Sequence, residues 1–435
     1  MTALHPNLLK LLAPLAAFAV TLALILSLGG GRDLEVPAGS DAKGIEVPPA
    51  ASAEERIELL QRAVREGDAD AGVLAALGQA HLQRARETGD PASYSRADRS
   101  YDAALRRDAR NVDAVLGAGT LAGLRHGFDE QLRRGVEARR LAPSVVAALP
   151  LIADAQIELG RYDAAERTLQ QLLDIKPNLT SYSRVSYLRE LTGDLPGAVE
   201  AMRLAVSAGG GDPENVAYVR VLLGDLELQQ GRVAAARLAY TAALRSVPGY
   251  PAGLVGLARA DAASGDLGRA AARLRRASAR LPLTATLSLL AQVEQARGDE
   301  AAADASLTAA RAQQRLYAAA ATLPDAETVL FEAEYGDPAR AVELGRQVWE
   351  RAPSIRSADA LAWAHVRAGH DEAGLSWARR ALRTGSHDAL LNLHAGVALE
   401  RVGRPQAAER HFELARRGRA ALSPAAARLL KEGTR

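Results

Sequence analysis

Small and apolar residues recur along most of the chain at fixed distances from a glycine. These glycines lie 33 to 38 residues apart, at Gly160, Gly193, Gly231, Gly265, Gly298, Gly336, Gly369 and Gly403. Self-similarity at this period is typical of a repeat array in which each unit is one supersecondary element. The chain after residue 53 is therefore predicted to be one array and not a set of separate domains.

Each repeat has the pattern of a helix, a turn, a second helix and a stop. Five residues after each glycine comes a small residue, and seven residues further comes another apolar residue, mostly alanine. A spacing of seven places both on one helical face, where small side chains let neighbouring helices approach closely. Prolines, which cannot continue a helix, end several repeats, at Pro143, Pro177, Pro213, Pro248, Pro282 and Pro353.

The repeats resemble tetratricopeptide repeats (TPRs), helical hairpins of about 34 residues. The matching residues are the turn glycines, the small residues, the closing prolines, Leu-Gly at 77–78 and 223–224, and a bulky residue at Tyr101, Tyr240 and Phe412. The resemblance covers residues 71 to 421. It implies an all-α, right-handed superhelical solenoid of about ten hairpins within residues 53–435. Residues 54–66 are expected to form a leading helix and residues 424–431 a closing helix.

The N-terminal 28 residues contain a separate apolar segment. Leu11 to Leu28 has no charge, and as a helix it is roughly 27 Å long, close to the thickness of the hydrocarbon layer of a membrane. We interpret residues 1–28 as a single N-terminal apolar helix that anchors the chain through residues 11–28, and residues 29–52 as a flexible linker. A cleaved signal peptide is the alternative. The signal-like layout favours an array outside the cytoplasm.

Composition and motifs give no sign of an active site. The net charge is only +2, and basic and acidic residues alternate along the chain without forming a basic patch. No nucleic-acid partner is therefore expected. There is no cysteine, and the histidines lack ligand spacing, so neither a metal nor a cofactor is expected. The glycine run at 209–211 could cradle a phosphate, but no predicted strand precedes it and no Gly-Lys-Ser/Thr follows. We interpret it as a spacer between two helices.

The resemblance implies a partner-binding groove lined by the first helix of each hairpin. In the middle repeats this helix is rich in the aromatic and guanidinium side chains that dominate protein interfaces. The candidate groove residues are Tyr182, Arg184, Tyr187, Tyr218 and Arg220. The alternative is that the tyrosines fill hairpin interfaces and the arginines pair locally.

An acidic residue occupies one repeat position where TPRs usually carry tyrosine, four residues before the turn glycine. It is present in four successive repeats, as Glu227, Asp261, Glu294 and Glu332. A shielded carboxylate must be paired or protonated, because an unpaired buried charge costs several kcal/mol. Two interpretations stay open. Either each acid pairs with a nearby arginine (Arg220, Arg237, Arg259 or Arg273), or the acids form a ladder along the groove that selects a basic peptide.

These observations predict a non-enzymatic, membrane-anchored scaffold that binds a protein or peptide partner. Assembly or export of cell-envelope components is the setting suggested by analogy. The alternatives are a soluble secreted or periplasmic adaptor after signal cleavage, and an accessory subunit of an enzyme complex.

Overall fold

The computed structural model describes residues 51–67 and 69–433. Among these residues there are 22 α-helices, one short 3₁₀ helix and no strand, which confirms the all-α prediction. The helices are α2 (Ala53–Glu66), α3 (Ala71–Thr88), α4 (Ala92–Arg107), α5 (Val112–Leu124), α6 (Phe128–Leu141), α7 (Ala148–Glu158), α8 (Tyr162–Ile175), α9 (Leu179–Leu191), α10 (Leu195–Ala208), α11 (Pro213–Gln229), α12 (Val233–Ser246), α13 (Pro251–Ala263), α14 (Leu267–Arg280), α15 (Thr284–Ala296), α16 (Glu300–Ala319), α17 (Ala326–Tyr335), α18 (Pro338–Arg351), α19 (Ile355–Arg367), α20 (Asp371–Ala381), α21 (Ala389–Arg401), α22 (Pro405–Arg417), η3 (Arg419–Ala421) and α23 (Pro424–Glu432).

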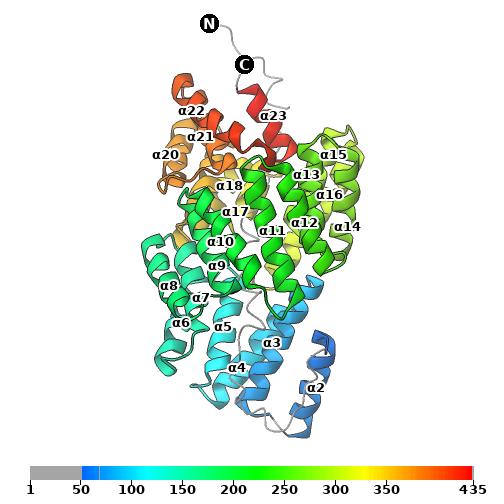
Figure 1. The fold of residues 1–435 in the computed structure, drawn as a ribbon, viewed down its shortest axis with the longest axis vertical. Coiled ribbons are helices and arrows are strands. Elements are labelled where there is room, and N and C mark those ends of the chain that lie inside the picture. Colours follow the sequence, from blue (N-terminus) through cyan, green and yellow to red (C-terminus); the bar gives the residue numbers. More distant parts are fainter. Residues whose placement is uncertain (1–50, 68, 434–435) are drawn as a thin grey trace. The chain divides into compact units, whose positions relative to one another are not determined.

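Helices α3 to α22 are ten consecutive hairpins, with α2 before them and α23 after them (Figure 1). Odd-numbered helices from α3 to α21 are the first helices of the hairpins and are called A helices below. Even-numbered helices from α4 to α22 are the second ones and are called B helices. In eight of the ten hairpins the A helix packs against its own B helix, and the B helix packs against the next A helix in pairs such as α6·α7 and α12·α13. This arrangement is the one that the repeat period predicts.

The turn glycines are required by the backbone. Seven of the eight predicted turn glycines have φ between 65° and 86°, the left-handed region that glycine adopts without a steric penalty. After Gly265, for example, the N–H of Asp266 donates to the carbonyl of Asp261 at 2.9 Å and closes the end of the A helix. Gly336 differs, because its φ is −122° and α17 before it has only 10 residues.

The predicted small residues lie in the hairpin interiors. Ala236, five residues after a turn glycine, is fully buried, as are its counterparts in the other repeats. Close approach is most evident at Tyr240, whose ring is fully buried between Gly224 and Gly256. A Cβ atom added at Gly256 would lie 2.3 Å from the ring, so only glycine fits there.

The described residues divide into two compact units. Unit 2 contains residues 51–185 and 315–323. Its second segment returns to the first one, because the backbone of Leu323 donates to the carbonyl of Arg125 at 3.1 Å and accepts from Nδ1 of His126 at 2.8 Å. The rings of Tyr94 and Tyr317 lie 6.4 Å apart in the same unit.

Unit 1 contains residues 186–314 and 324–433 of the described chain. Its late hairpins return to its early ones. Thr384 Oγ1 donates to the carbonyl of Leu191 at 2.6 Å, and Arg259 Nη2 on α13 donates to the carbonyl of Ala421 at 3.1 Å. Helix η3 packs on α11 and α13, and α23 packs on α15. The C-terminal segment of this unit therefore covers part of its own A helices.

The predicted anchor at residues 11–28 and nearly all of the predicted linker at 29–52 lie outside the described residues. Within residues 51–433, apart from residue 68, no helix is both long enough and apolar enough to cross a membrane.

Candidate functional site

The candidate residues on α9 are largely engaged by the protein itself. Arg184 is 3% exposed, and its Nε and Nη2 each donate at 2.9 Å to a different carboxylate oxygen of Asp154 on α7. Its Nη1 also donates to the carbonyl of Thr180 at 3.2 Å. Tyr182, on the same helix, is half-buried. Within unit 2, Arg184 therefore ties α7 to the first half of α9.

Tyr187 belongs to a buried cluster of unit 1 that joins distant hairpins. It is 3% exposed, its hydroxyl accepts from Nε of Arg356 on α19 at 3.2 Å, and the guanidinium lies 5.6 Å from the ring centroid. The same guanidinium is 3.9 Å from Glu190, which accepts from Gln229 Nε2 at 2.7 Å. Burial raises the pKa of Glu190, and the charge of Arg356 opposes this shift.

The candidates on α11 also lie against neighbouring helices. Tyr218 is 5% exposed. Arg220 is half-buried, and its Nη1 donates to the carbonyl of Ala242 at 3.2 Å and to Oγ of Ser246, both on α12. The two arginines thus pair locally, as the alternative interpretation expects. Partner binding by these residues stays a prediction.

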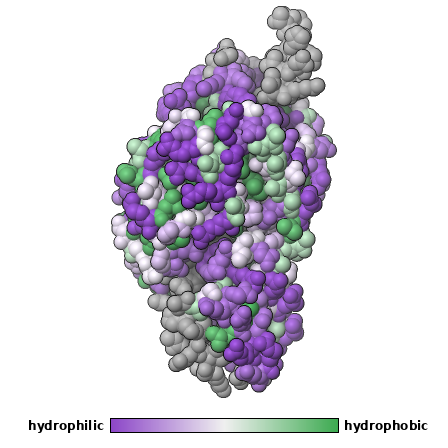
Figure 2. Space-filling view, turned by 90° about the vertical axis from the view of Figure 1, so that its right-hand side faces the viewer, coloured by the Kyte–Doolittle hydropathy of each residue, from purple (hydrophilic) through white to green (hydrophobic). Residues whose placement is uncertain are grey.

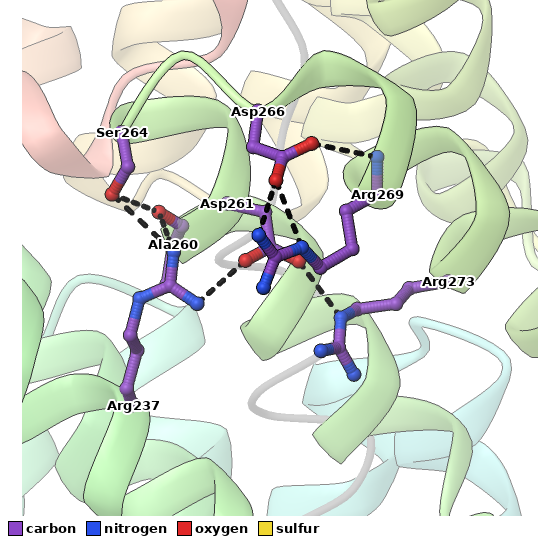
Figure 3. Close-up of polar contacts among 7 residues, drawn as sticks. All are labelled: Arg237, Ala260, Asp261, Ser264, Asp266, Arg269 and Arg273. Atoms are coloured by element: carbon purple, nitrogen blue, oxygen red, sulfur yellow. Dashed lines mark hydrogen bonds and ion pairs between the residues drawn. The ribbon is translucent and has the colours of Figure 1, made fainter.

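The acidic position before the turn is buried and paired with arginine. Asp261 at the end of α13 is fully buried, and its two oxygens accept from different arginines (Figure 3). Arg237 Nη1 from the preceding B helix lies 2.5 Å from Oδ1, and Arg273 Nε from the B helix of the same hairpin lies 2.8 Å from Oδ2. One carboxylate therefore links three consecutive helices, α12, α13 and α14.

The hairpins on either side repeat this arrangement. Each has a buried acid whose two oxygens bind different arginines, one of them from the preceding B helix. Glu227 pairs with Arg203 at 3.1 Å and with Arg232, and Glu294 pairs with Arg275 at 2.5 Å and with Arg297 at 2.6 Å. Glu332 does not have this arrangement, because its carboxylate is half-buried and lies 3.8 Å from a single arginine, Arg340.

The pairing interpretation is confirmed for Glu227, Asp261 and Glu294, but only two of the four candidate arginines bind one of these acids. Arg237 and Arg273 do bind Asp261. Arg220 binds α12 instead, as described above. Arg259 points to a different carboxylate, which lies two residues before Glu227 in the sequence. Spacing alone does not tell which neighbour a long side chain reaches.

That carboxylate, Asp225, is the centre of a network that sequence analysis missed. Its Oδ1 accepts from Arg259 Nη1 and from the hydroxyl of Tyr240, both at 2.7 Å, while Oδ2 is buried with no hydrogen-bond partner among the described residues. Burial raises the pKa of Asp225, and Arg259 and Tyr240 oppose the shift. A signal was present in the sequence, since Asp225 and Arg259 have opposite charges at the same position of adjacent repeats, six residues before Gly231 and Gly265.

The sequence also raises two other kinds of site, a metal centre and a phosphate-binding loop. No set of three His, Cys, Asp or Glu side chains suited to a metal ion occurs within the described part of the chain. The glycine run 209–211 joins α10 to α11, and Asp212 caps α11 by accepting from the N–H of Glu214 at 2.9 Å. The start of α11 already has its own anionic group, as the spacer interpretation expects.

Comparison with protein families agrees with the helical hairpins. Two models described as "Tetratricopeptide repeat" match the chain, one at residues 227–293 and the other at residues 151–213 and 192–251. Together these matches span residues 151–293. The matched segment includes α9, α11 and α13 and two of the paired acids, Glu227 and Asp261, and it ends one residue before Glu294. No curated protein sequence matches the chain.

Several solved structures are similar to this chain at low identity. The APC/C hetero-tetramer Cut9-Hcn1 is 16% identical, with a TM-score of 0.49, over 88% of this chain and 67% of that one. The human IFIT1 dimer with PPP-AAAA is 13% identical, with a TM-score of 0.48, over 87% and 99%. A tetratricopeptide repeat protein from Parabacteroides merdae is 16% identical, with a TM-score of 0.42, over 60% and 93%. The ligands and partners in these names belong to those proteins and are not assigned to this chain.

Proposed function

We propose that the protein is a non-enzymatic scaffold whose TPR hairpins bind a protein or peptide partner. TPR hairpins are in general protein-binding modules, and stacking of identical supersecondary units creates extended surfaces for that purpose. The observation that carries the proposal is the stack of ten hairpins, of which residues 151–293 match TPR models. Tyr182, half-buried on an A helix, is the groove candidate best placed to meet a partner.

The absence of catalysis is part of the proposal. Its support is that several buried carboxylates are held in ion pairs within the fold, as Asp154 is by Arg184 and Asp261 is by Arg237 and Arg273. Groups held in ion pairs within the fold are not free to act as acids, bases or nucleophiles. An accessory role in an enzyme complex is compatible with this chemistry.

Membrane attachment through residues 11–28, with the array outside the cytoplasm, completes the proposal. The anchor rests on the uncharged stretch Leu11 to Leu28, and the orientation rests on the signal-like layout of the N-terminal segment. Alkaline extraction of membranes, followed by N-terminal sequencing of the retained product, tests it. A chain that is retained and still contains residues 11–28 supports the anchor, whereas a released chain that begins after Leu28 supports the secreted alternative.

Partner binding is tested by photo-crosslinking of the full chain in its native membranes. The photoreactive residue p-benzoylphenylalanine replaces Tyr182 in one variant and Ala234, which is exposed on the B helix α12, in the control. One discrete crosslinked product from position 182 and none from position 234 supports binding by the A helices. Equal products from both positions contradict it, and substrate turnover by the purified chain contradicts the non-enzymatic assignment.

A further inference from the structure

The three paired acids, Glu227, Asp261 and Glu294, are buried, whereas the arginines that bind them are partly exposed at the surface. The carboxylate side chains of Glu227, Asp261 and Glu294 are at most 3% exposed. Their arginine partners are 24% to 62% exposed and form what we call the arginine strip, which consists of Arg203, Arg232, Arg237, Arg273, Arg275 and Arg297. Each carboxylate is bound by two guanidinium groups, so each repeat retains one net positive charge at the surface.

The B helices beside the strip add to this charge. Neither α12 nor α14 contains an acidic residue, and together they carry Arg237, Arg245, Arg269, Arg273, Arg275, Arg276 and Arg280. Only Arg269 of these pairs with a carboxylate at the surface, that of Asp266. Hydrophilic residues cover much of the side of the molecule that carries α14 and α16 (Figure 2). Helices α12 and α14 themselves thus carry seven positive charges and no negative one, in a chain whose net charge is only +2.

We propose that the arginine strip binds an acidic protein segment in an extended conformation. The surface charge is opposite to the one that an acidic ladder would have. The acids are buried and the arginines are exposed, so the surface selects an acidic peptide and not a basic one. Guanidinium groups suit this role, since they bind carboxylates through two N–H groups and stay charged at every physiological pH. The buried carboxylate beneath each pair fixes the positions of the arginines, which lowers the entropy lost on binding.

The repeat spacing indicates how the ligand is built. The A helices α11 and α13 are in contact, and packed helices lie about 8–10 Å apart, so the arginine pairs of Glu227 and Asp261 are separated by about that interval. An extended chain advances about 3.3 Å per residue, so acidic residues at every third position match the strip. A nucleic-acid strand carries a charge about every 3.4 Å, which is denser than the strip offers. The pattern thus favours an acidic polypeptide.

Fluorescence anisotropy with the full chain in neutral-detergent micelles tests the proposal. The probe is a labelled peptide of five Glu-Gly-Ser repeats, and its Gln-Gly-Ser counterpart is the control peptide. The strip variant R203Q/R273Q/R275Q removes one arginine from each pair, so every buried acid keeps the other. Loss of three exposed charge contacts, each worth a few-fold in affinity, weakens binding of the Glu peptide about tenfold. The matched variant R346Q/R379Q/R410Q, which removes three exposed arginines elsewhere in unit 1, leaves the affinity unchanged.

Three results would overturn the proposal. They are absence of Glu-peptide binding by the unmodified chain, equal weakening by both triple variants, and strip-dependent binding of anionic phosphatidylglycerol vesicles or oligo(U) without binding of the peptide. If circular dichroism shows that the strip variant unfolds earlier, R203Q/R275Q replaces it. These are the two most exposed arginines of the strip, at 62% and 51%, and Glu227 and Glu294 each keep their second arginine. Their loss must weaken peptide binding several-fold.

Discussion

Replacing Arg184 by methionine separates a structural role from a partner-binding role for one candidate groove residue. The guanidinium and the carboxylate of Asp154 are 4% and 6% exposed, and two hydrogen bonds of 2.9 Å join them. Methionine preserves much of the side-chain volume but leaves the carboxylate buried without its cation. Removing one partner of a buried pair costs about 3–5 kcal/mol of unfolding free energy. Loss of the hydrogen bond to Thr180 adds about 1 kcal/mol.

The double variant R184M/D154L provides the control, because apolar replacement of both partners of a buried pair is often nearly neutral. We expect it to recover most of the lost stability. Urea unfolding followed by far-UV circular dichroism measures the change, and hydrogen exchange of α7 and α9 locates it. If R184M loses less than about 1 kcal/mol, or if the double variant is no more stable than R184M, the ion pair does not have the role assigned here.

Four further predictions follow from the fold. G256A forces a Cβ to within 2.3 Å of the Tyr240 ring and should cost about 1–3 kcal/mol in urea unfolding, and an unchanged midpoint would contradict the close packing. Burial raises the pKa of Asp225 in the folded protein, so its protonated form stabilises the fold at low pH and this contribution is lost as the pH rises through the folded-state pKa. The stability of D225N relative to the unmodified chain should therefore increase as the pH rises above about 4, and a constant difference would refute the assignment. Deleting residues 418–435 removes η3 and α23 from their contacts with α11, α13 and α15 and should lower the thermal midpoint, unless those contacts contribute nothing. Residues 53–435 alone should be soluble and helical, and an insoluble or weakly helical product would show that the array needs the N-terminal segment.

The sequence predicts what depends on local periodicity. Turn glycines and buried alanines such as Ala236 follow directly from the repeat, because each hairpin buries the same face. The leading and closing helices were expected at 54–66 and 424–431 and are observed as Ala53–Glu66 and Pro424–Glu432. Helix boundaries are accurate here because capping residues such as Ser52 and Ser423 mark them.

The sequence does not predict which side chains of different hairpins contact one another. The contact of Tyr187 with Arg356 joins residues 169 positions apart, and no repeat offset encodes it. The repeat pattern does not predict the partners of Glu227, because one arginine lies in the previous B helix and the other lies in the turn. Burial decides the role of Arg184, and composition alone does not reveal it.

The return of the late hairpins of unit 1 to its early ones has a consequence for how this unit folds. In an open repeat array each unit contacts only its neighbours, so the ends can fray and stability is close to a sum of local terms. The hydrogen bond from Thr384 to Leu191 instead closes a loop of 193 residues, and bringing such ends together costs about 4.7 kcal/mol of chain entropy beyond a constant. The contacts between the late and early hairpins of unit 1 must together offset this cost. Unit 1 should therefore unfold more cooperatively than an open array of the same length, and it should form its last contacts late, because high contact order slows folding.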